Sequence, residues 1–298
     1  MANASASLVM PRGGFLLRIV DLFQRAIADL AAKLPDLGNI SDDAFVREGV
    51  TKTGAEGDFQ SALDPIAESH LVGFLGKALQ LDFSGLHVSI QGEEGGFNGS
   101  QEPTGLVLLI DPFDGTINIP TGGQPFATAL ALVWKHADSR LTPLVSVVYD
   151  HLNRRWWSAT MDSQTLYNGE PCHTSDFSLK RGIMYGAFTV RKPSQGKIVR
   201  AVHKEVAHLA ASYQAISCST VALGHIACGT ALALVHSHPK KDDAGAHTLL
   251  VRQAGGIVSY RRGSILIAAA NQSGYDRLNQ ALKGLSAPDQ GWSLWWPP

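Results

Sequence analysis

Residues 106 to 110, Leu-Val-Leu-Leu-Ile, form an unbroken apolar run that ends at Asp111. A run without the polar alternation of a half-exposed strand is typical of a strand buried inside a sheet. The pattern therefore predicts a large β-sheet in the first half of the chain, with this run as one of its buried strands. The other strands predicted for this sheet are 86–90, 126–134, 144–149 and 156–160.

Helical patterns lie on both sides of this sheet in the sequence. Apolar residues recur every three or four positions from Leu16 to Leu34, which predicts a helix ending at Pro35. A second helix is predicted to start with Asp64 as N-cap and Pro65 at the first helical position, and to run to about residue 80. The second half alternates between predicted strands at 183–190, 230–235, 256–260 and 265–270 and helices near 197–211, near 243–254 and from 275. Helices interleaved with strands predict a layered α/β fold.

The composition excludes several classes of protein. Apolar residues make up 45% of the 298 residues and charged residues 17%, as in a compact enzyme. With a net charge of -1 and no basic stripe, we expect no nucleic-acid polymer as a partner. Charges interrupt the apolar segment 15–34, so we expect neither a signal peptide nor a membrane span. Three widely spaced cysteines fit a reducing compartment, and we expect a cytoplasmic protein.

Two carboxylates, Asp111 and Asp114, follow the buried run in the sequence Asp-Pro-Phe-Asp-Gly-Thr. On a turn that Pro112 stiffens, both can face one point, and two close carboxylates repel each other unless a divalent cation neutralises them. Ligands that are all oxygen atoms favour magnesium over zinc. Backbone N–H groups at Gly115 and Thr116 would be available to a phosphate. Taken alone, however, Asp-Pro and Asp-Gly are ordinary turn signals.

Further carboxylates lie at the ends of other predicted strands or the starts of predicted helices. Glu93 and Glu94 follow the preceding strand, Asp64 opens a helix, and Asp242 and Asp243 open another. Each has an ordinary explanation, as a solvated loop, an N-cap or a favourable charge at a helix start. Together with the Asp-Pro-Phe-Asp motif, they indicate a site rich in carboxylates.

Five motifs follow one another in a fixed order. They are Lys52 with Asp58-x5-Asp64, Gly92-Glu93-Glu94, Asp111-Pro-Phe-Asp114-Gly-Thr-Ile-Asn118, Tyr167-Asn168-Gly169-x-Pro171 and Asp243-x5-Leu-Leu-Val-x2-Ala-Gly-Gly256. In this order the chain resembles the inositol monophosphatase family, within the lithium-sensitive, magnesium-dependent phosphatases that also include fructose-1,6-bisphosphatase and bisphosphate nucleotidase. The resemblance covers roughly residues 15 to 285.

The resemblance implies a fold and an activity. The fold would have alternating α-β-α-β-α layers, as in sugar phosphatases. The activity would be hydrolysis of a small phosphate monoester, such as an inositol, sugar or related polyol phosphate, by a metal-activated water. The resemblance also implies a homodimer. It divides the chain into a tail at 1–14, a catalytic domain at 15–285 with halves at about 15–180 and 181–285, and a Trp-rich tail at 286–298.

The resemblance also implies roles for individual residues. Two or three magnesium ions would be held by Glu93, Asp111, the backbone carbonyl of Phe113, Asp114, Asp243 and, for a further weaker ion, Asp64. The residues implied in catalysis are Glu93 and Thr116, which would orient the attacking water, and Asp64. The residues implied in binding phosphate or substrate are Gly115, Thr116, Lys52, Ser219, Thr220, His236 and Asp242, with Ser219 and Thr220 in a substrate-facing turn.

Two departures from the family pattern bear on the substrate. Asp242 stands where the family usually has Trp, which leaves Asp242 as an alternative to Asp243 for the last ligand and adds charge near the leaving group. His236 stands where relatives carry an acidic contact to inositol, and a histidine does not accept hydroxyl protons as a carboxylate does. A nucleotide phosphatase, acting on a 3′-phosphoadenosine 5′-phosphate type of substrate or a biosynthetic nucleoside phosphate, is therefore one alternative. A non-catalytic relative that binds metal and phosphate is another.

Overall fold

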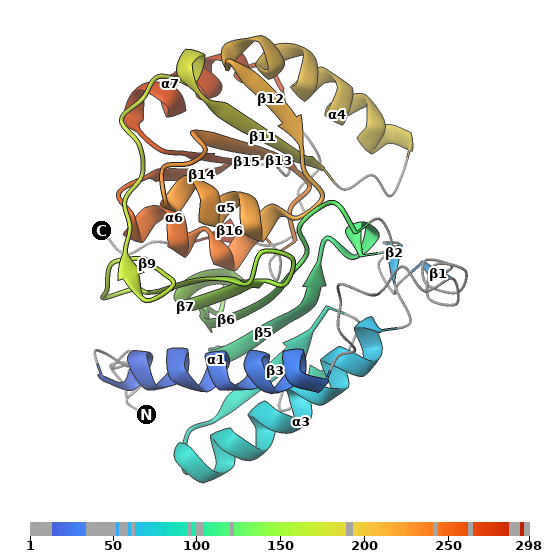
Figure 1. Ribbon diagram of the computed structural model, residues 1–298, viewed down its shortest axis with the longest axis vertical. Coiled ribbons are helices and arrows are strands. Elements are labelled where there is room, and N and C mark those ends of the chain that lie inside the picture. The colour runs from blue at the N-terminus through green and yellow to red at the C-terminus, as the bar shows by residue number, and fades with distance from the viewer. Residues whose placement is uncertain are drawn as a thin grey trace, which may run out of the picture.

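The computed structural model describes the chain in eleven segments. They are residues 14–33, 52–53, 59–60, 63–93, 97–98, 104–119, 122–188, 193–240, 244–261, 265–285 and 293–294. In Figure 1 these segments form five stacked layers, helix, sheet, helix, sheet and helix, which confirms the predicted α/β layering. No helix in these segments combines the length and apolar character needed to cross a bilayer.

The larger sheet is mixed and has nine strands among the described residues, in the order β10-β9-β8-β7-β6-β5-β3-β4 with β16 beside β7. Its strands are β3 (Val88–Gly92), β4 (Phe97–Asn98), β5 (Gly105–Asp114), β6 (Ala127–Lys135), β7 (Arg140–Asp150), β8 (Arg155–Thr160), β9 (Leu166–Tyr167), β10 (Glu170–Pro171) and β16 (Ser293–Leu294). Strand β5 pairs in parallel with β3 and antiparallel with β6. The predicted strand 106–110 therefore lies inside the sheet, as expected, and both of its faces are buried.

The smaller sheet has the order β12-β11-β13-β15-β14. Its strands are β11 (Ile183–Phe188), β12 (Ser212–Ala215), β13 (Ala233–Ser237), β14 (Ile257–Arg261) and β15 (Ile265–Ala269). A separate antiparallel pair, β1 (Lys52–Thr53) with β2 (Phe59–Gln60), completes the described strands.

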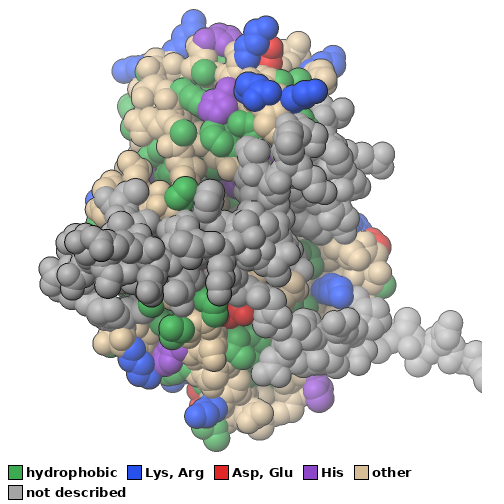
Figure 2. All heavy atoms as spheres, turned by 90° about the vertical axis from the view of Figure 1, so that its right-hand side faces the viewer, with side chains coloured by type: hydrophobic (Ala, Val, Ile, Leu, Met, Phe, Trp, Pro, Cys, Tyr) green, Lys and Arg blue, Asp and Glu red, His purple; other side chains and the backbone are tan. Residues whose placement is uncertain are grey.

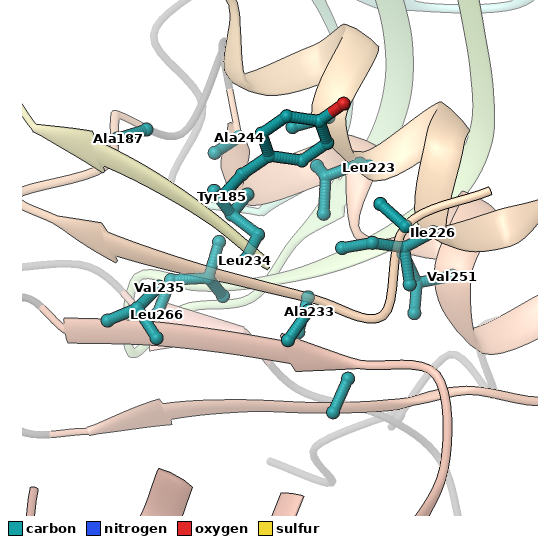
Figure 3. Packing of buried hydrophobic residues seen from close by; sticks show 14 of the residues in the cluster. Tyr185, Ala187, Leu223, Ile226, Ala233, Leu234, Val235, Ala244, Val251 and Leu266 are labelled. Carbon is teal, nitrogen blue, oxygen red and sulfur yellow. The ribbon is translucent and has the colours of Figure 1, made fainter. Parts of the chain in front are cut away.

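The helices form three layers around these sheets (Figure 1). Helices α1 (Gly14–Lys33) and α3 (Asp64–Asp82) cover the outer face of the larger sheet, α5 (Ser219–Ala227) and α6 (Leu249–Gln253) lie between the sheets, and α4 (Pro193–Val206) and α7 (Gln272–Ala281) cover the smaller sheet. One apolar core lies beneath α1 and α3, and a larger one surrounds α5 and α6. In Figure 3, Leu223 and Ile226 of α5 and Val251 of α6 lie beside Ala233 of β13 in this larger core.

Neighbouring residues on one strand divide between the two cores. Trp157 is buried in the core around α5, whereas Trp156 packs against the core beneath α1. Each ring has an aromatic neighbour, Tyr167 for Trp157 and Tyr149 for Trp156. The two side chains therefore lie on opposite faces of β8, as successive residues of a strand do.

Several predicted elements need correction. Helix α5 and strand β12 were not predicted, and the helix predicted for 197–211 ends as α4 at Val206. The helix predicted for 243–254 is present but interrupted: residues 244–247 are helical, Thr248 forms a turn, and α6 continues from Leu249 to Gln253. Asp64 is not an N-cap: Leu63 has that position, and the Asp64 side chain lies near Thr116 instead. The predicted tails lie outside the described residues, apart from Gly14 and strand β16.

Candidate functional site

A bulge in strand β5 organises the Asp-Pro-Phe-Asp motif. Asp111 pairs with Ala129 of β6 and Asp114 pairs with Ala127, so two residues of β5 stand opposite the single residue Thr128. Two residues opposite one define a β-bulge. The motif predicted as a turn after the strand is thus an irregular continuation of it.

The bulge places both carboxylates on one face of the sheet. Residues three apart on a regular strand point to opposite faces, because side chains alternate. Ala127 and Ala129 are two apart on β6, share a face, and belong to the core around α5. Their partners Asp114 and Asp111 therefore share that face, where they are 8% and 1% exposed. Because of the extra residue in the bulge, Asp111 and Asp114 lie on the same face of the sheet although they are three positions apart.

A buried polar contact holds this bulge. The Thr128 hydroxyl donates to the Pro112 carbonyl at 2.8 Å and lies 2.7 Å from Nε2 of His151. Because the hydroxyl has a single proton, His151 Nε2–H is the donor in the second bond, which fixes the ring tautomer. Burial lowers the pKa of His151 to about 3, so the ring stays neutral. Neither Thr128 nor His151 was identified from the sequence.

The first turn of α5 faces Asp114 from the other side. Oδ2 of Asp114 accepts hydrogen bonds of 2.7 Å from both the backbone N–H and the hydroxyl of Thr220. The Ser219 hydroxyl and the Cys218 thiol lie at 3.4 and 3.5 Å from the same oxygen. Ser219 and Thr220 are therefore buried at a helix start, not in a turn, and their predicted contact with substrate remains a prediction.

The electrostatics of Asp114 reflect its burial. Loss of solvent raises the pKa of this carboxyl above its usual range, and the two Thr220 hydrogen bonds oppose that rise. The negative charge of Glu93 raises the pKa further, so Glu93 lies close enough to interact with Asp114. The charge of Glu93 therefore makes the ionised form of Asp114 more costly.

The residues after the bulge bring the chain towards α3. Gly115 has a φ of 85°, and a Cβ there would lie 3.0 Å from Cβ of Cys218, so this position requires glycine. In the following short helix η2 (Thr116–Asn118), the Thr116 hydroxyl donates to the Phe113 carbonyl at 2.8 Å. The same hydroxyl is 3.4 Å from Oδ1 of Asp64, which is 1% exposed at the start of α3. Residues about 50 positions apart in the sequence thus meet at Thr116.

Glu93 directly follows strand β3, at the same end of the sheet. Gly92 pairs with Ile110, and the backbone N–H of Glu93 donates to the Ile110 carbonyl at 3.0 Å. The carboxylate of Glu68, on α3, packs so closely on Gly92 that a Cβ there would overlap it. Glu93 itself forms an ion pair through Oε1 with Nζ of Lys240, and these side chains are 19% and 11% exposed. Lys240 was not identified from the sequence, where Lys240-Lys241 is an isolated basic pair.

The donor chemistry fits a hard divalent cation. Glu93, Asp111, Asp114 and the Phe113 carbonyl all offer oxygen, which magnesium-like ions prefer. Burying several anionic side chains together is costly unless a cation compensates them. Within the described ranges, however, no three His, Cys, Asp or Glu side chains are arranged to hold a metal ion. The described residues therefore provide part of a donor set.

Four other residues were predicted to belong to the site: Lys52, His236, Asp242 and Asp243. Lys52 lies in β1, where only the backbone is described, and Asp242 and Asp243 lie outside the described residues. His236 lies on β13, 3% exposed, with Nδ1 3.1 Å from the Ser237 carbonyl. The roles of these residues remain predictions. On the face shown in Figure 2, Lys and Arg side chains gather mainly at the top, over the layer that holds α4, with a few more at the bottom.

Comparison with known proteins places the chain among its relatives. Residues 22–288 match the model of the inositol monophosphatase family. Phosphatase IMPL1, chloroplastic, of Arabidopsis thaliana is 26% identical over 70% of this chain, although the match spans only 59% of the plant protein. Nus factor SuhB of Xylella fastidiosa is 29% identical over 70% of both chains.

Solved structures show the same fold. The extragenic suppressor protein suhB from Bartonella henselae has a TM-score of 0.73 at 21% identity, over 90% of this chain and 99% of the other. The carboxylate strand, the layered architecture and the family match over most of the sequence agree, and the chain belongs to the inositol monophosphatase family.

Proposed function

We propose that this protein is a phosphatase that hydrolyses a small phosphate monoester. The observation that carries the proposal is the β5 bulge, which presents Asp111 and Asp114 on one face beside Glu93. Membership of a family whose members are generally metal-dependent phosphatases supports it. A sugar or polyol phosphate is favoured over inositol phosphate, because His236 replaces the acidic inositol contact of relatives.

The proposed metal ligands are Glu93, Asp111, the Phe113 carbonyl, Asp114 and Asp243, with Asp64 nearby. When bound, magnesium would neutralise the phosphate dianion and lower the pKa of a bound water. The chain's own residues would do the rest by positioning. Glu93 and Thr116 would orient the water, and the N–H groups of Gly115 and Thr116 would bind phosphate oxygens.

Asp64 and two lysines would complete the proposed site. The Asp64 carboxylate lies beside the Thr116 hydroxyl and would fix its orientation. Lys240 lies beside Glu93 and would add positive charge at the phosphate. Lys52, in the β1–β2 pair, would approach from a different segment, and Asp242 would lie near the leaving group.

A second candidate function is binding without hydrolysis. The ion pair between Lys240 and Glu93 favours it, because the proposed metal ligand Glu93 is already paired with a positive side chain of the protein. Relatives named Nus factor also favour it, because that name is not the name of an enzyme. Under this hypothesis the site would bind phosphate and leave it unreacted.

A substrate panel separates these functions. Purified protein would be assayed for phosphate release from sugar, polyol, inositol and nucleoside phosphates, with magnesium, with chelator, and with added lithium. We expect magnesium-dependent release that lithium inhibits, strongest for a sugar or polyol phosphate. Release from nucleoside phosphates alone would select a nucleotide phosphatase. No release from any compound, with phosphate binding still detectable by calorimetry, would select the non-catalytic function.

Two further features belong to the same proposal. A cytoplasmic homodimer is expected from the family resemblance, and sedimentation equilibrium tests the dimer. A monomer at all concentrations would overturn that part alone.

A further inference from the structure

Cys172 and Cys228 lie side by side although 56 positions separate them in the sequence. Cys172 directly follows β10, and Cys228 directly follows α5. Their Sγ atoms are 3.2 Å apart, and both residues are partly exposed. A disulfide bond is about 2.05 Å long, so an approach of about 1 Å would join them.

The surrounding backbone keeps the two segments together. The N–H of Cys172 donates to the Thr165 carbonyl at 3.0 Å, and the N–H of Cys228 donates to the Gly224 carbonyl at 3.1 Å. Gly229, with a φ of 71°, lies so close to the segment after Cys172 that a Cβ there would be 3.2 Å from the His173 carbonyl. The proximity of the thiols therefore rests on fixed backbone on both sides.

The environment makes the two thiols unequal. The indole N–H of Trp157, a residue 1% exposed, donates to Sγ of Cys228 at 3.2 Å. The hydrogen bond with Cys172 lowers the pKa of Cys228, burial opposes this, and the Trp157 bond lowers it further. The pKa of Cys172 is raised by the same pair contact. The Trp157 N–H directed at Cys228 would stabilise a thiolate at that position, and thiolate character makes a cysteine nucleophilic, so we assign Cys228 as the attacking member.

The third cysteine differs in each respect. Cys218 is fully buried, with its Sγ 3.5 Å from Oδ2 of Asp114. A buried neutral thiol is chemically inert. Cys218 therefore serves as a control inside the same molecule.

We propose that Cys172 and Cys228 form a redox-active dithiol that a hydroperoxide converts into an intramolecular disulfide. The Cys228 thiolate attacks the terminal oxygen of the peroxide, the O–O bond breaks, and the sulfur becomes a sulfenic acid while the peroxide leaves as water or an alcohol. Cys172 sulfur then attacks the Cys228 sulfur, the S–O bond breaks, and a second water leaves with the Cys172 proton. The two thiols are oxidised by two electrons, and the hydroperoxide is reduced by two.

The test follows the thiols themselves and needs no substrate. Reduced full-length protein would be treated with one equivalent of hydrogen peroxide, denatured, alkylated and mapped by mass spectrometry. We expect a mass lower by two hydrogen atoms, a disulfide-linked pair of peptides containing Cys172 and Cys228, and alkylation at Cys218 alone. Dithiothreitol should restore all three thiols. Three alkylated cysteines after treatment, or a link that includes Cys218, would overturn the proposal.

Two variants separate the roles of the pair. In Cys172→Ser, the reaction should stop at a sulfenic acid on Cys228, which dimedone traps. In Cys228→Ser, oxidation of Cys172 should be roughly tenfold slower or more, since burial still raises the pKa of the Cys172 thiol and the Trp157 N–H is directed at position 228. Equal rates in the two variants would contradict the assignment of Cys228 as the attacking thiol. Circular dichroism would verify that each variant folds.

Discussion

Strand β5 and helix α5 meet at Asp114 and contribute opposite things to it. The strand carries negative charge, with Asp111 and Asp114 side by side on one face. The helix carries no charged residue in its first turn and supplies neutral donors, chiefly the N–H and hydroxyl of Thr220. Strand β5 buries anionic side chains, and helix α5 supplies hydrogen-bond donors that lower the free-energy cost of burying them.

The two elements also reach this place by different means. The strand depends on a local irregularity, the bulge at Pro112 and Phe113 that Thr128 holds from the neighbouring strand. The helix depends on packing: Trp157 lies so close to Gly224 that a Cβ there would be 2.5 Å from the indole ring. Substitutions in β5 should therefore lower the rate of phosphate release, and substitutions in α5 should lower both that rate and the free energy of unfolding.

The largest effect is expected for Asp111→Asn on the charged side. This substitution keeps the shape and removes a charge from the proposed metal site, which is worth several kcal/mol of transition-state stabilisation. The turnover rate should fall about a thousandfold or more. Phosphate release on the best substrate of the panel measures it, with circular dichroism as a test of folding.

Asp138→Asn is the matched control. Asp138 is an exposed carboxylate paired with Arg140, so it undergoes the same chemical change away from β5. Its activity should equal that of the unmodified protein. A normal rate of phosphate release in Asp111→Asn would show that Asp111 is not part of the site, and that the carboxylates of β5 do not have the proposed role.

The donor side should respond more weakly to Thr220→Val. The change removes the 2.7 Å hydroxyl bond to Asp114 and leaves the backbone bond in place. Loss of one donor to a buried carboxylate should lower the free energy of unfolding by about 1–3 kcal/mol. Activity should fall about 10- to 100-fold, as for other groups that orient a metal ligand.

Ser219→Ala gives the comparison within the same turn. Its hydroxyl is 3.4 Å from the same oxygen, so its loss should cost less than about 1 kcal/mol. Urea unfolding and steady-state kinetics on both variants measure the two effects. If Ser219→Ala costs as much as Thr220→Val, distance to Asp114 does not determine what α5 contributes.

The same contrast explains what the sequence could predict. The carboxylates of β5 belong to a compact motif after an apolar run, and the layered fold follows from alternating strands and helices. The bulge could not be predicted, because it depends on register with β6. Helix α5 was missed because nearly all its residues are buried, so it has no polar face and no helical period. Lys240 was missed because its partner Glu93 is 147 positions away.

The smallest effect is expected from protonation of His225 on α5. Burial lowers the pKa of this ring from the ordinary value of 6.5, the charge of Arg155 lowers it further, and Asp150 opposes the change. Nδ1 of His225 lies 3.1 Å from the Tyr185 hydroxyl. Below pH 6.5 the unfolded chain binds a proton that the folded ring resists, so the free energy of unfolding falls as the pH falls.

One such group changes the free energy of unfolding by at most about 1.4 kcal/mol per pH unit. His225→Asn keeps a polar group near the Tyr185 hydroxyl and removes the titration. Urea unfolding from pH 7 to 5 should therefore show a smaller acid loss in His225→Asn than in the unmodified protein. Equal acid losses in His225→Asn and the unmodified protein would show that His225 does not contribute to the loss of stability in acid.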